Sequence, residues 1–308
     1  MLWYCVIGSA FALVSPHIDV TTFALVSPHI DAARVVRTVV ALPTMYSLMS
    51  LNEYATHRYF QHLDFNRKDA LPFIKRTYRI LTGASANPII KGDGHVEHHA
   101  ETFDDMSLKY SDRWQRTPAS KLLDADDFRG TAFHWHATGI MTIQMLPSVL
   151  PTYCLMGWSV PDTLALLLPC MLLHALVWNA IHPPMHGLPP VPLHVGAPSF
   201  VLAGVLAETE YFKYIFENHM GHHVLGGQVN YNVCCPGTDH LLGTYVPTEV
   251  WLDRMRPLPA NAKTRGAIVG FHGMPVPPVC EADIVASAPA AITVRGGGGV
   301  LADAYSEE

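Results

Sequence analysis

Two stretches with the same histidine spacing decide the expected fold: residues 95–99 read HVEHH and residues 219–223 read HMGHH. In an α-helix, positions i, i+3 and i+4 lie on one face. Each stretch would therefore present three imidazoles on one side of a helix without distorting the backbone. Two such helices facing each other would bring six ring nitrogens together, which favours a helical protein built around a metal site.

Two histidine pairs lie at the ends of apolar segments. His57 and His62 have the spacing H-x4-H, and His182 and His186 have the spacing H-x3-H. Five residues rotate a side chain by about 140° on an ideal α-helix. We therefore expect the first pair where a helix ends, or on different metals. The second pair encloses two prolines, which disfavour a helix interior, so we expect the segment to break there and turn His186 inward.

The four groups together hold ten of the 18 histidines of the chain. A tetrahedral metal takes four ligands, so ten neutral imidazoles suit two metals with open positions better than one ion. Imidazole binds iron, zinc and copper alike, so the residues alone do not choose the metal. The metal ligands that we predict are His57, His62, His95, His98, His99, His182, His186, His219, His222 and His223. Asp239 and His240 are candidates for orienting a ligand from behind through a hydrogen bond.

The composition favours a membrane protein. Apolar residues make up 49% of the chain and charged residues 15%, whereas soluble domains are about a quarter charged. Stretches 35–54, 137–158 and 163–181 are candidate membrane segments, and Asp162 carries the only formal charge between residues 131 and 207. A buried hairpin of a soluble protein is the alternative for the last two. With a possible contribution from the apolar residues 1–14, we expect an all-α fold with about three to four membrane segments.

The order of these segments places the histidines. If 35–54 crosses once and the 137–181 hairpin crosses and returns, all four histidine groups lie on one side of the membrane. The basic region 58–129 predicts that this side is the cytoplasm. The expected molecule is therefore an integral membrane protein with a cytoplasmic helical cap that carries a histidine-ligated dimetal site.

The two ends of the chain differ from its middle. Residues 1–32 contain FALVSPHID twice, at 11–19 and 23–31, which is too few copies for a solenoid. Residues 33–256 are expected to form the membrane domain. Residues 257–308 are rich in proline, alanine and glycine, and we expect them to be loosely ordered.

Charge and cysteine content exclude two other classes of protein. The net charge of -6 gives no basic signature for nucleic-acid binding, so we expect no nucleic-acid partner. The six cysteines include no CxxC pair and no regular spacing, so reduced thiols are expected rather than a disulfide framework.

Residues 52–244 resemble the fatty acid hydroxylase/sterol desaturase superfamily, whose members are histidine-rich membrane di-iron oxygenases. Glu53-Tyr54-x-x-His57-Arg58-x-x-x-His62 is similar to its first motif, and the other three histidine groups are similar to the motifs that follow. Residues 230–232 (NYN) and 236–244 (PGTDHLLGT) resemble its closing signature. The gaps between residues 62 and 95 and between 186 and 219 are longer than those expected in ceramide fatty acid 2-hydroxylases. The given sequence shows no cytochrome b5-type haem domain.

The resemblance implies a chemistry. It implies two iron ions, which zinc can replace in the isolated protein, with O2 as co-substrate and a separate cytochrome b5-type or other electron donor. It implies an oxidoreductase of lipid biosynthesis, a monooxygenase that hydroxylates a fatty acyl chain or a sphingolipid-like lipid. A sterol desaturase, sterol methyl oxidase or carotenoid hydroxylase of the same superfamily is the alternative. The endoplasmic reticulum is the expected membrane if the source is eukaryotic.

Two readings from other classes stay open. The first is a membrane protein that binds metal without catalysis. A degenerate relative of the enzyme is one form of it, yet all four histidine groups are complete. The second is a zinc hydrolase, but the signature H-E-x-x-H is absent and no obvious carboxylate base accompanies the histidines.

Overall fold

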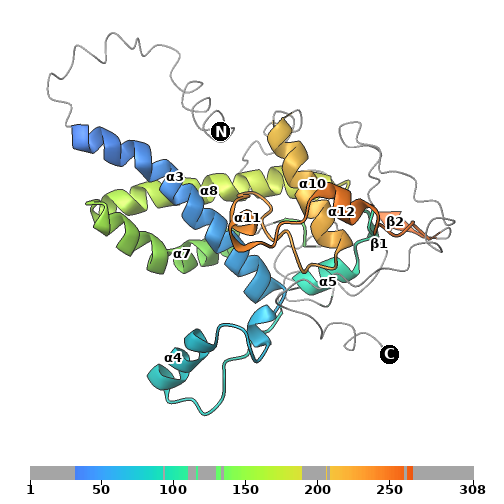
Figure 1. Cartoon of the computed structure of the whole chain (residues 1–308), viewed down its shortest axis with the longest axis horizontal. Coiled ribbons are helices and arrows are strands. Elements are labelled where there is room, and N and C mark those ends of the chain that lie inside the picture. Colours follow the sequence, from blue (N-terminus) through green and yellow to red (C-terminus); the bar gives the residue numbers. More distant parts are fainter. Residues whose placement is uncertain are drawn as a thin grey trace, which may run out of the picture.

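The computed structural model describes residues 32–92, 94–109, 116, 130–132, 135–188, 206, 209–259 and 262–265. This part of the chain is mostly helical, as the sequence predicts, with two short strands (Figure 1). The duplicated FALVSPHID segment and residues 266–308 lie outside the described residues.

Three long helices form one half of the molecule: α3 (Ala32–Ala55), α7 (Trp135–Leu155) and α8 (Val160–Met185). Figure 1 shows α7 and α8 as a hairpin that α3 crosses. Ser159 begins α8 as its N-cap, because its side-chain oxygen accepts a hydrogen bond from the backbone N–H of Asp162 at 3.2 Å. At the crossing, the hydroxyl of Tyr153 donates a hydrogen bond to the carbonyl of Ala41 at 2.5 Å.

The core between these helices is rich in methionine, a flexible side chain that fills irregular gaps. Met45, Met145 and Met171 are all buried there. The same three helices also carry large apolar side chains on their exposed surface. These include Val39, Val40, Leu51, Ile140, Ile143, Leu155, Leu168 and Leu172. Helices with an apolar core and an apolar exterior are suited to a surrounding that is itself apolar.

Among the described residues, α8 is the one helix long and apolar enough to cross a membrane. The expected segments 35–54 and 137–158 fall largely on α3 and α7, which are long enough to cross a membrane but less apolar than α8. Three to four membrane segments therefore stay a prediction.

The expected break at the two prolines of α8 is wrong. The helix runs through Pro183 and Pro184 and ends at Met185, with His186 as its C-cap. Each proline removes an N–H donor that would have bonded one turn earlier, so the packing of this buried helix end must offset that loss. Here the backbone N–H of His186 donates to the carbonyl of Pro183 at 2.9 Å, and Gly187 donates to Pro184 at the same distance.

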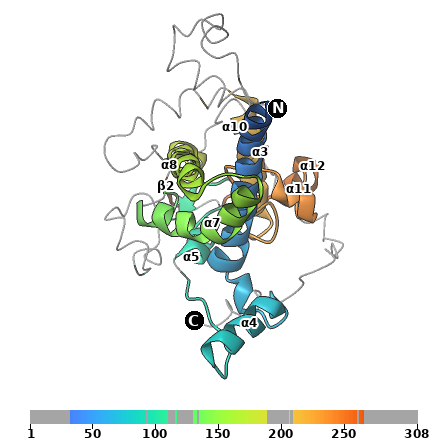
Figure 2. The same ribbon diagram turned by 90° about the vertical axis from the view of Figure 1, so that its left-hand side faces the viewer.

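Short elements form the other half of the molecule. After α3 the chain continues into η1 (Thr56–Gln61), η2 (Asp64–Asn66), α4 (Pro72–Thr82) and α5 (His95–Ala100). The C-terminal elements are α10 (Glu210–Val224), α11 (Thr238–Leu242) and α12 (Thr248–Leu252). Strand β1 (Leu108–Lys109) pairs antiparallel with β2 (Thr264–Arg265), so the described part of the tail rests against the domain. Figure 2 shows that α4 projects away from the other helices.

Candidate metal centre

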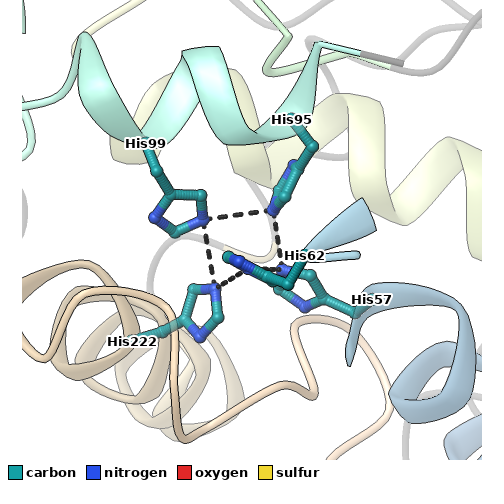
Figure 3. Close-up of side chains that lie close together, drawn as sticks. All are labelled: His57, His62, His95, His99 and His222. Carbon is teal, nitrogen blue, oxygen red and sulfur yellow. Dashed lines mark hydrogen bonds between the residues drawn. The ribbon is translucent and has the colours of Figure 1, made fainter. Parts of the chain in front are cut away.

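The ten histidines of the four sequence groups lie together in two clusters of five. Within each cluster the potential ligand atoms all lie within 4.8 Å of one another. Cluster 1, drawn in Figure 3, consists of His57, His62, His95, His99 and His222. Cluster 2 consists of His98, His182, His186, His219 and His223.

Each H-x-x-H-H triplet divides between the two clusters. On α5, positions i and i+4 (His95 and His99) belong to cluster 1, whereas position i+3 (His98) belongs to cluster 2. On α10 the division is reversed, because His219 and His223 belong to cluster 2 and the third histidine belongs to cluster 1. The two helices therefore bridge the clusters, and each cluster takes two histidines from one triplet and one from the other.

The pair His57 and His62 lies in one cluster because the backbone between them is a π-helix. The backbone N–H of His62 donates to the carbonyl of His57 at 2.9 Å, which is the i to i+5 bond that defines this helix. A turn of this width brings residues five apart onto one face. The H-x4-H spacing, which an α-helix would splay by about 140°, becomes a converging pair here.

The ring nitrogens of cluster 1 point toward a common centre (Figure 3). The Nε2 atom of His57 lies 2.8 Å from Nε2 of His95, and Nε2 of His222 lies 3.0 Å from that of His62 and 3.1 Å from that of His99. In cluster 2, Nε2 of His219 lies 2.8 Å from Nε2 of His182 and 3.1 Å from that of His223.

Backbone carbonyls hold the opposite ring nitrogens. In cluster 1, the Nδ1 atoms of His57 and His222 lie 2.5 Å from the carbonyl oxygens of Tyr231 and Val229. In cluster 2, the Nδ1 atoms of His182 and His186 lie 2.6 Å and 2.9 Å from the carbonyl oxygens of Thr131 and Met106. A carbonyl can only accept, so each Nδ1 carries the proton and each Nε2 presents a lone pair to the cluster centre.

The bend at Asn230 places both carbonyls that serve cluster 1. Asn230 has a φ of 53°, a left-handed conformation that asparagine tolerates better than most residues. Its side chain fixes the bend, because Nδ2 donates to the carbonyl of Val246 at 3.0 Å and Oδ1 accepts from the Val246 N–H at 2.6 Å. The neighbours on either side, Val229 and Tyr231, can then both direct their carbonyls at histidines.

Two buried carboxylates anchor the loop that follows. Glu53 of α3 accepts backbone N–H bonds from Val233 (3.0 Å), Cys234 (2.6 Å) and Cys235 (2.7 Å). These N–H groups lie in the interior, where an unmade hydrogen bond costs about 1–3 kcal/mol. Glu53 therefore ties this loop to α3, and with it the carbonyl that orients His57.

Asp239 acts on the same loop from α11. Its two carboxylate oxygens accept from the backbone N–H groups of Tyr231 at 3.0 Å and Asn232 at 2.6 Å. It therefore orients His57 indirectly, because it holds Tyr231, whose carbonyl contacts the ring. The sequence suggested a direct hydrogen bond from Asp239 to a ligand instead. The structure does not bring His240 to the clusters: it is exposed, and its Nε2 lies 2.6 Å from the hydroxyl of Tyr214.

Burial keeps the clustered histidines neutral. It lowers the pKa of His57 from 6.5 to about 4, while the Tyr231 carbonyl and the charge of Glu53 oppose this shift. Burial and then the mutual repulsion of neighbouring imidazoles lower the pKa well below 6.5 for His62, His95, His99, His219, His222 and His223. A metal binds the neutral imidazole, so these groups need not lose a proton near neutral pH.

The residues present fit a bound metal in each cluster. Lone pairs of His57, His182 and His222 face other ring nitrogens at about hydrogen-bond distance, an arrangement that a cation would stabilise. The buried Nε2 atom of His186 has no hydrogen-bond partner among the described residues. Neither cluster of potential ligands contains a carboxylate. Imidazole-only sets of this kind suit iron, zinc or copper.

A third buried group, Glu53, His174 and Cys235, has donor atoms close enough for a metal. Its geometry favours a structural role, because both oxygens of the Glu53 carboxylate already accept backbone N–H bonds. Nε2 of His174 lies 3.8 Å from the same carboxylate. The thiol of Cys235 is free, as are those of the other cysteines among the described residues, Cys154, Cys170 and Cys234.

No family model, no curated protein and no solved structure matches this chain. The class of protein follows from the site itself: a mostly helical, histidine-rich protein with two adjacent groups that could each hold a metal ion.

Proposed function

We propose that this protein is a membrane-bound, O2-dependent di-iron oxidoreductase that hydroxylates a lipid, with one iron in each histidine cluster. The observation that carries the proposal is the pair of imidazole-only clusters joined by α5 and α10. Shared helices keep the two sites at a fixed separation, which suits two metals that act together. A sterol desaturase, sterol methyl oxidase or carotenoid hydroxylase is the alternative within the same chemistry.

Five imidazoles suit an iron ion that must also react. Iron commonly takes six ligands, so five histidines would leave one position open for O2 or substrate. When bound, the two irons would supply the activation of O2 and the attack on an unactivated C–H bond. Hydroxylation puts one oxygen atom into the product and releases the other as water. The two electrons and two protons that this requires would come through a separate electron donor, such as a cytochrome b5-type protein.

The chain itself would supply geometry and a dry environment. His98, His182, His186 and His219 have no measurable exposed surface, so bulk water is excluded from cluster 2. Carbonyls of Val229, Tyr231, Thr131 and Met106 fix the protonated nitrogen of four ligands, so that the ring nitrogens facing the metals are already oriented. Such preorganisation lowers the cost of holding the metal pair during the reaction.

A lipid substrate is favoured by the position of cluster 2. Two of its histidines, His182 and His186, lie at the end of α8, the helix able to cross a membrane. A lipid chain lying along the exposed apolar side chains of this helix, such as Leu168 and Leu172, would approach the metals from within the bilayer.

The test is turnover by the purified chain, loaded with iron in nanodiscs and supplied with a reductant and a panel of fatty acyl, sphingolipid, sterol and carotenoid substrates. A product heavier by one oxygen atom, labelled from 18O2, supports the hydroxylase. Loss of two hydrogens supports the desaturase. Full iron loading without O2 uptake above that of the metal-free chain on any substrate would contradict the proposal and favour a metal-binding protein without catalysis.

A further inference from the structure

Helix α4 (Pro72–Thr82) is amphipathic, with apolar residues on one side and basic residues on the other. Its apolar residues fall within about 160° of the helix circumference at 100° per residue, and they are Phe73, Ile74, Tyr78, Ile80 and Leu81. The other side carries Lys75, Arg76 and Arg79. Residues 72–82 include no Asp or Glu.

The structure buries Lys75 of the basic side, whereas Arg76 and Arg79 are exposed. Lys75 is only 3% exposed, and its ammonium donates to the backbone carbonyl of Arg67 and lies 5.1 Å from the centre of the Phe65 ring. The apolar side faces outward, with Phe73 and Leu81 each 79% exposed and Ile80 70% exposed. A helix in water would be expected to bury these apolar residues and leave the lysine exposed.

We propose that the apolar face of α4 inserts into the surface of a lipid bilayer as an interfacial helix. Such helices bury large apolar side chains among the acyl chains and keep cationic residues at the level of the headgroups. Arg76 is exposed beside the apolar face, and Arg79 is the basic residue of the last turn. Both would attract anionic headgroups.

The size of the face favours lipid over a protein partner. A specific protein interface commonly takes about 20–30 residues from each side, whereas α4 has 11 residues and projects away from the other helices (Figures 1 and 2). Ile89, which follows α4 in the chain, is also 79% exposed. A bilayer needs no matching shape and covers such a projection without further contacts.

The position of α4 has a consequence for cluster 1. The chain passes from α3 through His57 and His62 to α4 within a few short turns. If α4 lies in the headgroup layer, cluster 1 is held near the boundary between bilayer and water. This inference does not depend on the proposed reaction, since a metal-binding protein without catalysis would insert the same helix.

The test uses the full chain in nanodiscs of phosphatidylcholine and phosphatidylserine, with the photoreactive residue benzoylphenylalanine in place of Leu81. The matched control carries it in place of Arg76, which lies about 140° from Leu81 around the same helix. Illumination followed by mass spectrometry identifies what each position touches. We expect lipid adducts from position 81 to exceed those from position 76 by about tenfold, as burial of one side of an interfacial helix requires.

Two results would overturn the proposal. One is equal lipid labelling from both positions, or no lipid labelling from either; the other is an adduct from position 81 with a second protein chain. Each variant must first show the same metal content as the unsubstituted chain. If the variant at position 81 does not, the photoreactive residue is placed at position 80 instead. In nanodiscs of phosphatidylcholine alone, labelling from position 81 should fall several-fold, because the attraction of Arg76 and Arg79 for anionic headgroups is lost.

Discussion

The two histidine clusters are alike in composition but are held in different ways. Cluster 2 rests on the end of the long helix α8, and four of its five histidines have no exposed surface. Cluster 1 rests on a π-helix and on the loop of residues 229–235, and its members His62 and His99 are slightly exposed. The loop has no regular secondary structure of its own and relies on Glu53, Asp239 and Asn230.

The two clusters therefore differ in how easily local opening of the chain would expose them. Long packed helices resist local opening, whereas a loop held by a few hydrogen bonds opens when one anchor is lost. We therefore expect damage to the molecule to empty cluster 1 before cluster 2.

The change Glu53→Ala should produce the largest effect. It leaves the N–H groups of Val233, Cys234 and Cys235 without their acceptor in a buried place. The cost should be about 3 kcal/mol or more in the free energy of unfolding, and the metal content should fall from two toward one per chain. Urea unfolding and elemental analysis measure both.

Glu53→Gln is the matched control for this anchor. Its amide oxygen can still accept two of the N–H bonds, but its NH2 group cannot accept the third. The loss should therefore be intermediate. Equal stability and two metals in Glu53→Ala would show that the loop does not depend on this carboxylate.

Acid should also destabilise the metal-free chain. The pKa of His57 is lowered from 6.5 to about 4, so between these values the unfolded state binds a proton that the folded metal-free state does not. The free energy of unfolding of the metal-free chain should therefore rise between about pH 4 and pH 6.5 and be constant above that range. The contribution of His57 to this rise should be about 3 kcal/mol. Urea midpoints across this range measure the effect. A midpoint that stays constant below pH 6.5 would contradict it.

Two adjacent glycines offer a smaller and more local test. Gly227 (φ +73°) lies against His62, and an added Cβ would come within 2.3 Å of the ring; Gly226 (φ +68°) has open space around the same position. Both alanine variants pay the left-handed backbone penalty of about 1 kcal/mol, but Gly227→Ala should also displace His62. We expect several-fold weaker metal binding in one cluster for Gly227→Ala and unchanged metal content for Gly226→Ala. Equal metal binding by the two variants would show that His62 is not held as described.

The sequence predicts the helical fold and the histidines that meet, because the helical period relates H-x-x-H-H directly to one face. It does not predict how each triplet divides between clusters, which depends on how α5 and α10 face each other. His57 and His62 lie where α3 ends, as one of the two alternatives expects, but the π-helix that makes them converge is not predicted by the α-helical period.

Other parts of the site carry weaker signals in the sequence. The carbonyls of Val229, Thr131 and Met106 leave no side-chain signature at all. Glu53 lies four residues before His57 in the sequence, but its role as a loop anchor needs the fold. The helix that continues through Pro183 and Pro184 shows that tertiary packing of a buried segment can override the local preference of proline against a helix.

The central claim is that the two clusters hold one metal each and that the pair acts together. The most direct measurement compares the iron content and the reductant-dependent O2 uptake of the purified chain with those of a His98→Ala/His222→Ala variant. This variant removes one histidine from each cluster, His222 from cluster 1 and His98 from cluster 2. The account predicts about two irons per chain and O2 uptake in the first, with both strongly reduced in the second. Metal retained by the variant at the same stoichiometry, or no iron bound by the unsubstituted chain, would contradict it.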